Sequence, residues 1–196
     1  MKKNRFFDFD ASTREKLNDP GSIPFKHRYL VAHYQKLENI RRDLKRLPSV
    51  EEFFFLQTSK QFNAFTFIPF IVKSENIRQL KASTYSISIR VVEGLIELYD
   101  QGLIEEIQLL VSDSLIKRNP VTLDKIDSMA KNRANISIDF TWNHSKVTLA
   151  KTDSSHFVIE GSGNWSENAA IEQYLFANSK GLFEFRNEIF EKWYLI

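Results

Sequence analysis

The stretch that decides the fold is residues 77–111, IRQLKASTYSISIRVVEGLIELYDQGLIEEIQLLV. Its first part, residues 77–84, and its last part, residues 105–111, have the character of strands. Between them, residues 89–101 form an amphipathic helical pattern that Gly102 closes. Two strands separated by a helix of this length are typical of a βαβ unit in a mixed or parallel sheet.

The same alternation continues toward the C-terminus. Residues 121–132 form a second helical pattern with Asn119-Pro120 at its start, and residues 134–140 follow as a strand. Helices that connect the strands of one sheet cover its faces. We therefore predict an α/β fold with a mixed sheet flanked by helices on both faces. The 17 phenylalanines predict a strongly aromatic core.

Residues before this region are harder to assign. Residues 52–57, EFFFLQ, form a short apolar run that is consistent with a strand. In residues 61–73 the apolar positions fit a helix, but alternation over residues 65–71 fits a strand nearly as well. Because Pro69 disfavours a central strand, we predict a helix that ends in a proline kink.

The N-terminal third has the pattern of an extension. In residues 26–47, apolar side chains recur at spacings of three and four, which predicts an amphipathic helix that Pro48 ends. Its basic residues lie mostly off the apolar stripe and fit either a solvated face or a grip on a nucleic-acid backbone. We predict that residues 1–60 are an N-terminal arm with a helical extension and that residues 61–196 are the main domain.

Composition limits the class of protein. With 196 residues, 42% hydrophobic and 27% charged, the chain resembles an ordinary globular domain, and its net charge of +2 is below that of a general polyanion binder. It has no cysteine, which excludes disulfides and thiolate metal sites and fits a reducing compartment. No stretch approaches the roughly 18–20 apolar residues that span a bilayer, and the charged start lacks the apolar core of a signal peptide. We predict a cytoplasmic protein with no membrane partner.

The chemically distinctive stretch is residues 140–176, FTWNHSKVTLAKTDSSHFVIEGSGNWSENAAIEQYLF. Residues 144–150 and 156–161 have the pattern of two strands joined by a turn, and residues 171–177 alternate as a further strand. Residues 180–193 then form the last helix. Polar groups that suit a phosphate therefore gather inside an otherwise apolar run.

The polar side chains of this stretch form a candidate site. His144 and Lys146 are two apart, so they point to one face of an extended strand, and Ser162 and Asn164 repeat this spacing. Ammonium, hydroxyl and amide groups neutralise the oxygens of a phosphate, and an imidazole attacks phosphorus or shuttles a proton. Glu172 can hold the imidazole in the needed tautomer. We predict His144, Lys146 and Glu172 as catalytic, and Lys146, Ser162 and Asn164 as phosphate-binding.

This set of residues resembles one catalytic half of the phospholipase D superfamily. The likeness rests on His144-x-Lys146, on Gly161-Ser162-x-Asn164 and on Glu172, and it spans about residues 75–193. The signature of that superfamily is HxK, then an aspartate, then GSxN or GSxxN. The resemblance implies a metal-independent phosphodiesterase with no cofactor, in which one histidine attacks phosphorus and a second protonates the leaving oxygen.

Only one such half is present in this chain. His27 and His33 lie in the predicted N-terminal helix, and His156 has no partner lysine. Members of the superfamily with one half pair two chains across a two-fold axis. The resemblance therefore implies a homodimer in which both copies of His144 face one phosphodiester, with DNA or RNA as candidate substrates.

One departure from the family pattern is specific. Lys151 stands where the aspartate is expected, unless a longer hairpin lets Asp153 take its place. The alternative reading is a catalytically inactive phospholipase D-like module that binds nucleic acid or protein. A lipid phosphodiesterase is a third hypothesis, although the sequence has no evident membrane surface.

Other kinds of site have weaker support. The four histidines lack metal-ligand spacing, and Ser162 lacks the GxSxG elbow of a hydrolase because Asn164 occupies the final glycine position. Trp142 and Trp165 flank the candidate site and fit either stacking on a base or packing in the core.

Overall fold

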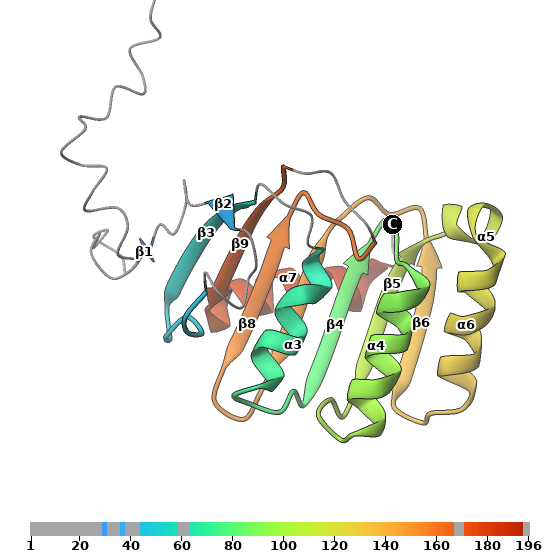
Figure 1. Ribbon diagram of the computed structural model, residues 1–196, viewed down its shortest axis with the longest axis horizontal. Helices are drawn as coiled ribbons and strands as arrows, with labels where there is room; N and C mark the ends of the chain where they lie inside the picture. Colours follow the sequence, from blue (N-terminus) through green and yellow to red (C-terminus); the bar gives the residue numbers. More distant parts are fainter. Residues whose placement is uncertain (1–28, 31–35, 38–43, 59–62, 167–170, 194–196) are drawn as a thin grey trace, which may run out of the picture.

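The computed structural model describes residues 29–30, 36–37, 44–58, 63–166 and 171–193. Within these ranges the strands form one nine-stranded sheet in the order β1-β3-β9-β8-β7-β4-β5-β6, with β2 also paired to β3 (Figure 1). The strands are β1 (Tyr29–Leu30), β2 (Lys36–Leu37), β3 (Glu52–Thr58), β4 (Gln79–Thr84), β5 (Ile107–Ser112), β6 (Ile136–Thr141), β7 (Val147–Lys151), β8 (His156–Gly161) and β9 (Gln173–Asn178). The helices are η2 (Ala64–Thr66), α3 (Phe67–Val72), α4 (Ile89–Asp100), α5 (Ser114–Arg118), α6 (Pro120–Lys131) and α7 (Lys180–Lys192).

Strand direction divides the sheet into two parts. β4, β5 and β6 are parallel to one another. The neighbouring pairs β4–β7, β7–β8, β8–β9 and β9–β3 are antiparallel. Helical crossovers connect the parallel strands, and a tight turn connects β7 to β8. The predicted mixed sheet is therefore confirmed.

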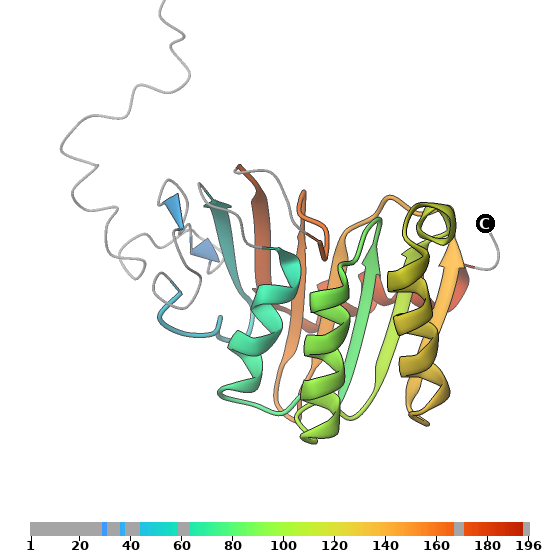
Figure 2. The same ribbon diagram turned by 45° about the vertical axis from the view of Figure 1, so that its right-hand side comes forward.

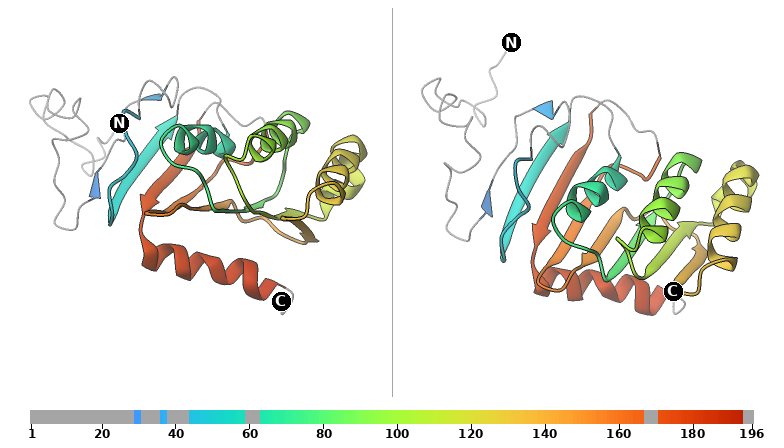
Figure 3. Two further views of the ribbon diagram at one scale, coloured as in Figure 1. Left: turned by 90° about the horizontal axis from the view of Figure 1, so that it is seen from below. Right: turned by 60° about the horizontal axis from the view of Figure 1, so that its bottom comes forward.

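Helices cover both faces of this sheet. α3, α4 and α6 lie side by side on one face (Figure 2), and α7 crosses the opposite face (Figure 3). The predicted α/β fold with helices on both faces is confirmed. Among the helices of the described ranges, none is both long and apolar enough to cross a membrane.

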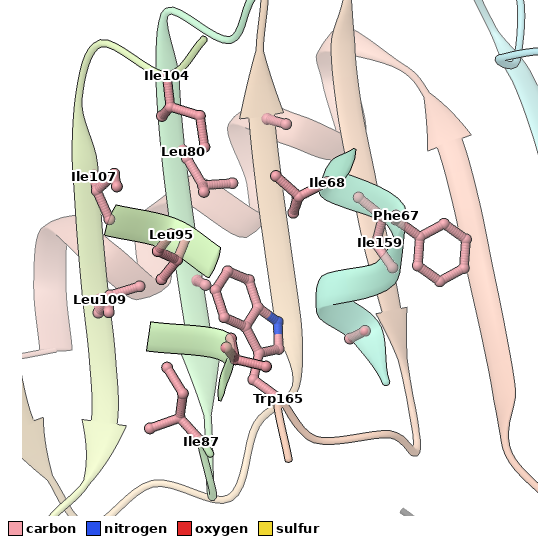
Figure 4. Packing of buried hydrophobic residues seen from close by; sticks show 14 of the residues in the cluster. Phe67, Ile68, Leu80, Ile87, Leu95, Ile104, Ile107, Leu109, Ile159 and Trp165 are labelled. Carbon is pink, nitrogen blue, oxygen red and sulfur yellow. The ribbon is translucent and has the colours of Figure 1, made fainter. Parts of the chain in front are cut away.

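Each layer of helices buries its own apolar cluster. The larger cluster lies between the sheet and α3, α4 and α6, and it includes aromatic contacts such as Phe67 with Phe176 at 5.2 Å between ring centres. Figure 4 shows Trp165 in this layer, close to Leu95 of α4. The smaller cluster lies under α7, where Leu149 of β7 packs with Phe183 and other apolar side chains. Adjacent β7 residues serve opposite faces, because side chains alternate along a strand.

Local sequence signals set the helix ends. The Ser88 hydroxyl accepts a hydrogen bond from the Val91 amide at the start of α4, and Gly102 adopts a φ of 71° after its end. At α6, the Asn119 side chain accepts a hydrogen bond from the Thr122 amide. These positions agree with the predicted helix boundaries.

Two predictions near the N-terminus are wrong. The predicted helix over residues 26–47 is absent where this range is described, since β1 and β2 are short strands parallel to β3 and residues 44–47 are not helical. The rest of that range, and residues 1–25, lie outside the described residues. Residues 67–72 are helical as predicted, but Pro69 lies in the first turn of α3, where its missing amide hydrogen costs no helix bond, so it does not end the helix.

The pairing of β3 bears on the domain division that we predicted at residue 60. β3 pairs with β9 from Glu52↔Asn178 to Gln57↔Gln173. Residues 52–58, assigned by that division to the extension, therefore share one sheet with the main domain.

Gly161 at the end of β8 provides a test of the register between β8 and β9. A Cβ there would collide with the backbone carbonyl of Gln173, whereas a Cβ at Gly181 in α7 would meet nothing within 4 Å. We expect Gly161→Ala to lower the free energy of unfolding by about 2–3 kcal/mol through overpacking. Gly181→Ala should raise it by up to about 1 kcal/mol through helix propensity. Denaturant unfolding of both variants measures this, and equal stabilities would contradict the register.

Candidate active site

The predicted site residues all lie in loops at one end of the strands, on the side of the sheet that we call the site edge. His144 and Lys146 directly precede β7, Ser162 and Asn164 follow β8, and Glu172 directly precedes β9. Because β7 and β9 run opposite to β8, their starts meet the end of β8 at this edge. β4, β5 and β6 also end here, at the upper edge in Figure 1. His144 and Lys146 were predicted inside a strand, but β7 begins only at Val147, so they lie in the loop before it.

His144 and Lys146 are in contact within this loop. Lys146 Nζ donates a hydrogen bond to the His144 carbonyl oxygen at 2.9 Å and lies 3.4 Å from His144 Nδ1. Burial lowers the pKa of Lys146, while the charges of Glu172 and Tyr85 act in the opposite direction. The lysine is thus directed at the imidazole and is electrostatically coupled to the carboxylate of another loop.

Ser162 and Glu172 form the second part of the site. The Ser162 hydroxyl donates a hydrogen bond to Glu172 Oε2 and accepts one from the Gln173 amide at 3.0 Å. The Glu172 residue is buried, with 9% exposure. A buried carboxylate needs such a donor and a nearby cation, and Ser162 and Lys146 supply them. The predicted contact of Glu172 with an imidazole stays a prediction.

Asn164 is fixed by the residues around it. Its backbone carbonyl accepts a hydrogen bond from the Ala64 amide at 3.2 Å. The next residue, Trp165, is almost fully buried and donates a hydrogen bond from its indole to Thr148 Oγ1 at 3.0 Å. Trp165 therefore packs in the core and is not a stacking platform, whereas Trp142 is 91% exposed and does not pack there.

Asn143 anchors the His144 loop, a role that no sequence pattern indicates. Its buried side-chain amide donates to Ser83 Oγ at 2.8 Å and to the Leu110 carbonyl at 3.1 Å. Its oxygen accepts from the Ser145 amide at 2.8 Å and from Ser145 Oγ at 2.7 Å. Every polar position of this side chain is used, so Asn143, just before His144, connects β4 and β5 to Ser145, just after it.

Tyr85 and Arg118 extend the site toward the parallel strands. The ring of Tyr85, which follows β4, lies 4.9 Å from the His144 ring centre to centre. Arg118 at the end of α5 places its guanidinium carbon 4.4 Å from the centre of the Tyr85 ring. Neither residue belongs to the motifs on which the family resemblance rests.

Lys151, at the position where the resemblance predicts an aspartate, and Asp153, its possible substitute, both lie far from this edge. Lys151 ends β7 and is exposed, at the opposite end of the strand from His144. Asp153, in the following turn, forms an ion pair with Arg78 at 2.7 Å, and this hydrogen-bonded partner lowers the pKa of Asp153. His156 also lies at that opposite end and packs against Phe183. None of these side chains contributes to the candidate site.

Metal-ligating side chains do not gather in the part of the chain that the structure describes. No group of three or more histidine, aspartate or glutamate side chains is close enough there to hold a metal ion. The functional groups at the site edge are one imidazole, one ammonium, one hydroxyl–carboxylate pair and one carboxamide.

Asn143 offers a test of how the loop is held. Asn143→Ala leaves buried partners on Ser83, Leu110 and Ser145 without their hydrogen bonds, and we expect a loss of about 3 kcal/mol in the free energy of unfolding. The matched control is Asn132→Ala, because the Asn132 amide donates to Ser128 on an exposed helix end. That variant should lose less than about 1 kcal/mol. Similar losses in both, measured by denaturant unfolding, would show that the Asn143 network does not hold the loop.

Comparison with known proteins identifies the fold. No protein-family model and no curated protein matches the chain. Among solved structures, it is similar to polyphosphate kinase from Porphyromonas gingivalis, with a TM-score of 0.50 and 14% identity over 73% of this chain and 26% of that chain. It also matches TrmBL2, an archaeal chromatin protein, with a TM-score of 0.44 and 12% identity over 68% of this chain and 51% of that chain. The chain thus spans about a quarter of the kinase and half of TrmBL2. At this level of identity the likeness shows a shared fold, the mixed α/β sheet described above, over the matched part of the kinase.

Proposed function

We propose that this protein is a metal-independent phosphodiesterase that cleaves nucleic acid and whose active site is completed by a second copy of the chain. The observation that carries the proposal is the contact between Lys146 Nζ and His144 at the sheet edge. An ammonium beside an imidazole pairs the group that neutralises a phosphate with the group that attacks it.

Phosphate binding requires Lys146 to change partners. Its ammonium now donates to the His144 carbonyl, a neutral acceptor. A phosphodiester oxygen carries charge and is the stronger acceptor, so the ammonium would turn toward it when substrate enters. Ser162 and Asn164 supply further donors from the loop after β8, and these bonds strengthen as charge moves onto the oxygens.

The tautomer of His144 decides whether its Nε2 can attack phosphorus. When Nδ1 accepts a hydrogen bond from Lys146, the proton of a neutral ring is on Nε2, which leaves Nε2 without a lone pair for attack. Attack through Nε2 needs the other tautomer, with a proton on Nδ1. Movement of Lys146 onto the phosphate removes the ammonium from Nδ1 and permits this change.

The proposed reaction has two displacements at phosphorus. Nε2 of one His144 forms the nitrogen–phosphorus bond while the bond to the leaving oxygen breaks, and the His144 imidazolium of the second copy gives that oxygen its proton. That second imidazole then takes a proton from water, whose oxygen attacks phosphorus and breaks the nitrogen–phosphorus bond. Glu172 holds Ser162 and balances the charge of Lys146, which positions both groups.

The openness of the site supports a polymeric substrate. His144 is exposed at the sheet edge, and Trp142 beside it is almost fully exposed. A nucleic-acid strand can therefore pass across this edge of the sheet without entering a closed pocket. This favours a nuclease over an enzyme for small diesters.

A second candidate function has one observation in its favour. Lys151 takes the place of the family aspartate, and Asp153 pairs with Arg78 instead. A phospholipase D-like module that binds nucleic acid or protein without turnover is consistent with this departure. Activity measurements separate the two.

The nuclease assay uses full-length protein with DNA and RNA in excess chelator. We expect cleavage that survives chelation and falls at least about 1,000-fold in His144→Ala, because the nucleophile is lost. The matched control is His156→Ala at the opposite end of the sheet, which should retain activity. Absence of cleavage of either polymer by the unaltered protein, or its loss with chelator alone, contradicts the proposal. In that case, salt-dependent binding that His144→Ala leaves unchanged selects the binding module.

The assembly can be tested separately. Sedimentation should give twice the 23.0 kDa mass of one chain at micromolar concentration. Mixed dimers of unaltered and His144→Ala chains should be inactive, because each site needs both imidazoles. A fully active monomer would refute the two-histidine mechanism.

A further inference from the structure

Arg118 differs from the other arginines whose contacts the structure describes. Four of them pair with carboxylates, namely Arg46 with Glu52, Arg78 with Asp153 and Glu105, Arg133 with Asp100, and Arg186 with Glu160. Arg118 instead donates from Nε to the Ser114 carbonyl at 3.3 Å and from one terminal nitrogen to Ser114 Oγ at 2.8 Å. Among the described residues, no carboxylate lies within ion-pair distance of it. Its charge therefore has only neutral partners, and the remaining N–H groups can bind an anion.

The position of Arg118 connects this cation to the candidate active site. The Tyr85 ring contacts both groups, since its centre lies 4.4 Å from the guanidinium carbon and 4.9 Å from the imidazole centre. Stacking on Tyr85 and the two bonds to Ser114 hold the exposed Arg118 side chain in one place. One aromatic ring thus contacts both the guanidinium and the proposed nucleophile.

Trp142 lies beside the same group of residues. It follows β6 directly, and β6 is tied to the start of α5 by a hydrogen bond from the Asp113 amide to the Thr141 carbonyl at 2.9 Å. Trp142 also precedes the Asn143-His144 loop, yet its side chain is 91% exposed. This exposed indole, two residues before His144 in the chain, offers a face on which a base can stack.

We propose that Tyr85, Arg118 and Trp142 form a second subsite that binds the nucleotide next to the scissile phosphate of a single-stranded nucleic acid. Arg118, oriented by Tyr85, takes the neighbouring phosphate, and Trp142 stacks on a base. This inference rests on the proposed function, because it assigns the scissile phosphate to His144. A chain of phosphates without bases would use Arg118 but not Trp142, and a small diester would use neither.

The binding experiment does not depend on turnover. A fluorescein-labelled oligothymidylate of about 12 nucleotides is titrated with the full chain in a His144→Ala background, so that the strand stays intact. We expect Arg118→Gln to raise Kd about tenfold at low salt and to reduce the salt slope by about one. Trp142→Ala should raise Kd about tenfold through lost stacking.

The matched control removes an equal charge elsewhere. Lys131 is the last residue of α6, at the opposite edge of the sheet. Lys131→Gln should therefore leave Kd within about twofold of its value in the parent protein. Equal Kd values for Arg118→Gln and Lys131→Gln overturn the subsite. A different outcome overturns the assignment to a nucleic-acid strand with bases. In it, Arg118→Gln raises Kd, Trp142→Ala leaves Kd unchanged, and inorganic polyphosphate competes as well as an unlabelled oligonucleotide.

A cleavage assay separates this inference from the proposed function. For proteins that cleave, the ratio of kcat/KM on the oligonucleotide to that on bis(4-nitrophenyl) phosphate should fall about tenfold in Arg118→Gln. Binding that depends on Arg118 and Trp142 without any cleavage by the unaltered protein supports the subsite and rejects the phosphodiesterase. Cleavage of both substrates with an unchanged ratio and unchanged Kd supports the phosphodiesterase and overturns the subsite.

Discussion

The antiparallel pairing of β7 with β4 is the constraint on which the candidate site depends. Ser83 pairs with Val147, so the end of β4 lies beside the start of β7. In an all-parallel sheet, the start of a strand lies at the edge opposite the ends of its neighbours, and His144 would lie far from Tyr85. Reversing one strand brings a loop that precedes a strand to the edge where loops after parallel strands converge.

Asn143 makes this arrangement specific. A buried amide with unmet hydrogen bonds is costly, and the bonds of Asn143 are met only when β4, β5 and the loop before β7 are in register. A shift by one residue would leave the amide buried without these partners and would move Val147 and Leu149 off the face covered by α7. The same polar contacts that hold the loop therefore also position His144.

Local sequence patterns predicted most of the fold, because they depend on neighbours in the chain. The helical period of residues 89–101, the Gly102 stop and the alternation of residues 134–140 each reflect burial on one side of an element. The helix predicted over residues 26–47 failed where it can be compared, because the free edge of β3 offers backbone partners to β1 and β2. Tertiary hydrogen bonds at a sheet edge override a helical spacing.

The candidate site was predictable only in part, for a related reason. His144, Lys146, Ser162, Asn164 and Glu172 were predicted as a group because they are close in sequence and resemble a family pattern, and the structure places them at one edge of the sheet. Asn143, Tyr85 and Arg118 could not be assigned roles, because their contacts depend on which strands are neighbours in the sheet. Trp142 and Trp165 look alike in sequence, and only burial separates the core residue from the exposed one.

The charges at the site edge connect the two proposals. In one copy of the chain, Lys146 and Glu172 carry opposite charges and interact electrostatically, so the pair adds little net charge. A second copy brings the same pair and leaves this balance unchanged. A phosphodiester adds one negative charge, and attack on it concentrates further charge on its oxygens, so the proposed dimer needs a cation that no carboxylate neutralises. Among the residues described at this edge, Arg118 meets that requirement, held by Ser114 and Tyr85 beside His144. If two imidazoles perform the chemistry, the guanidinium is therefore the group that makes the edge attractive to a polyanion.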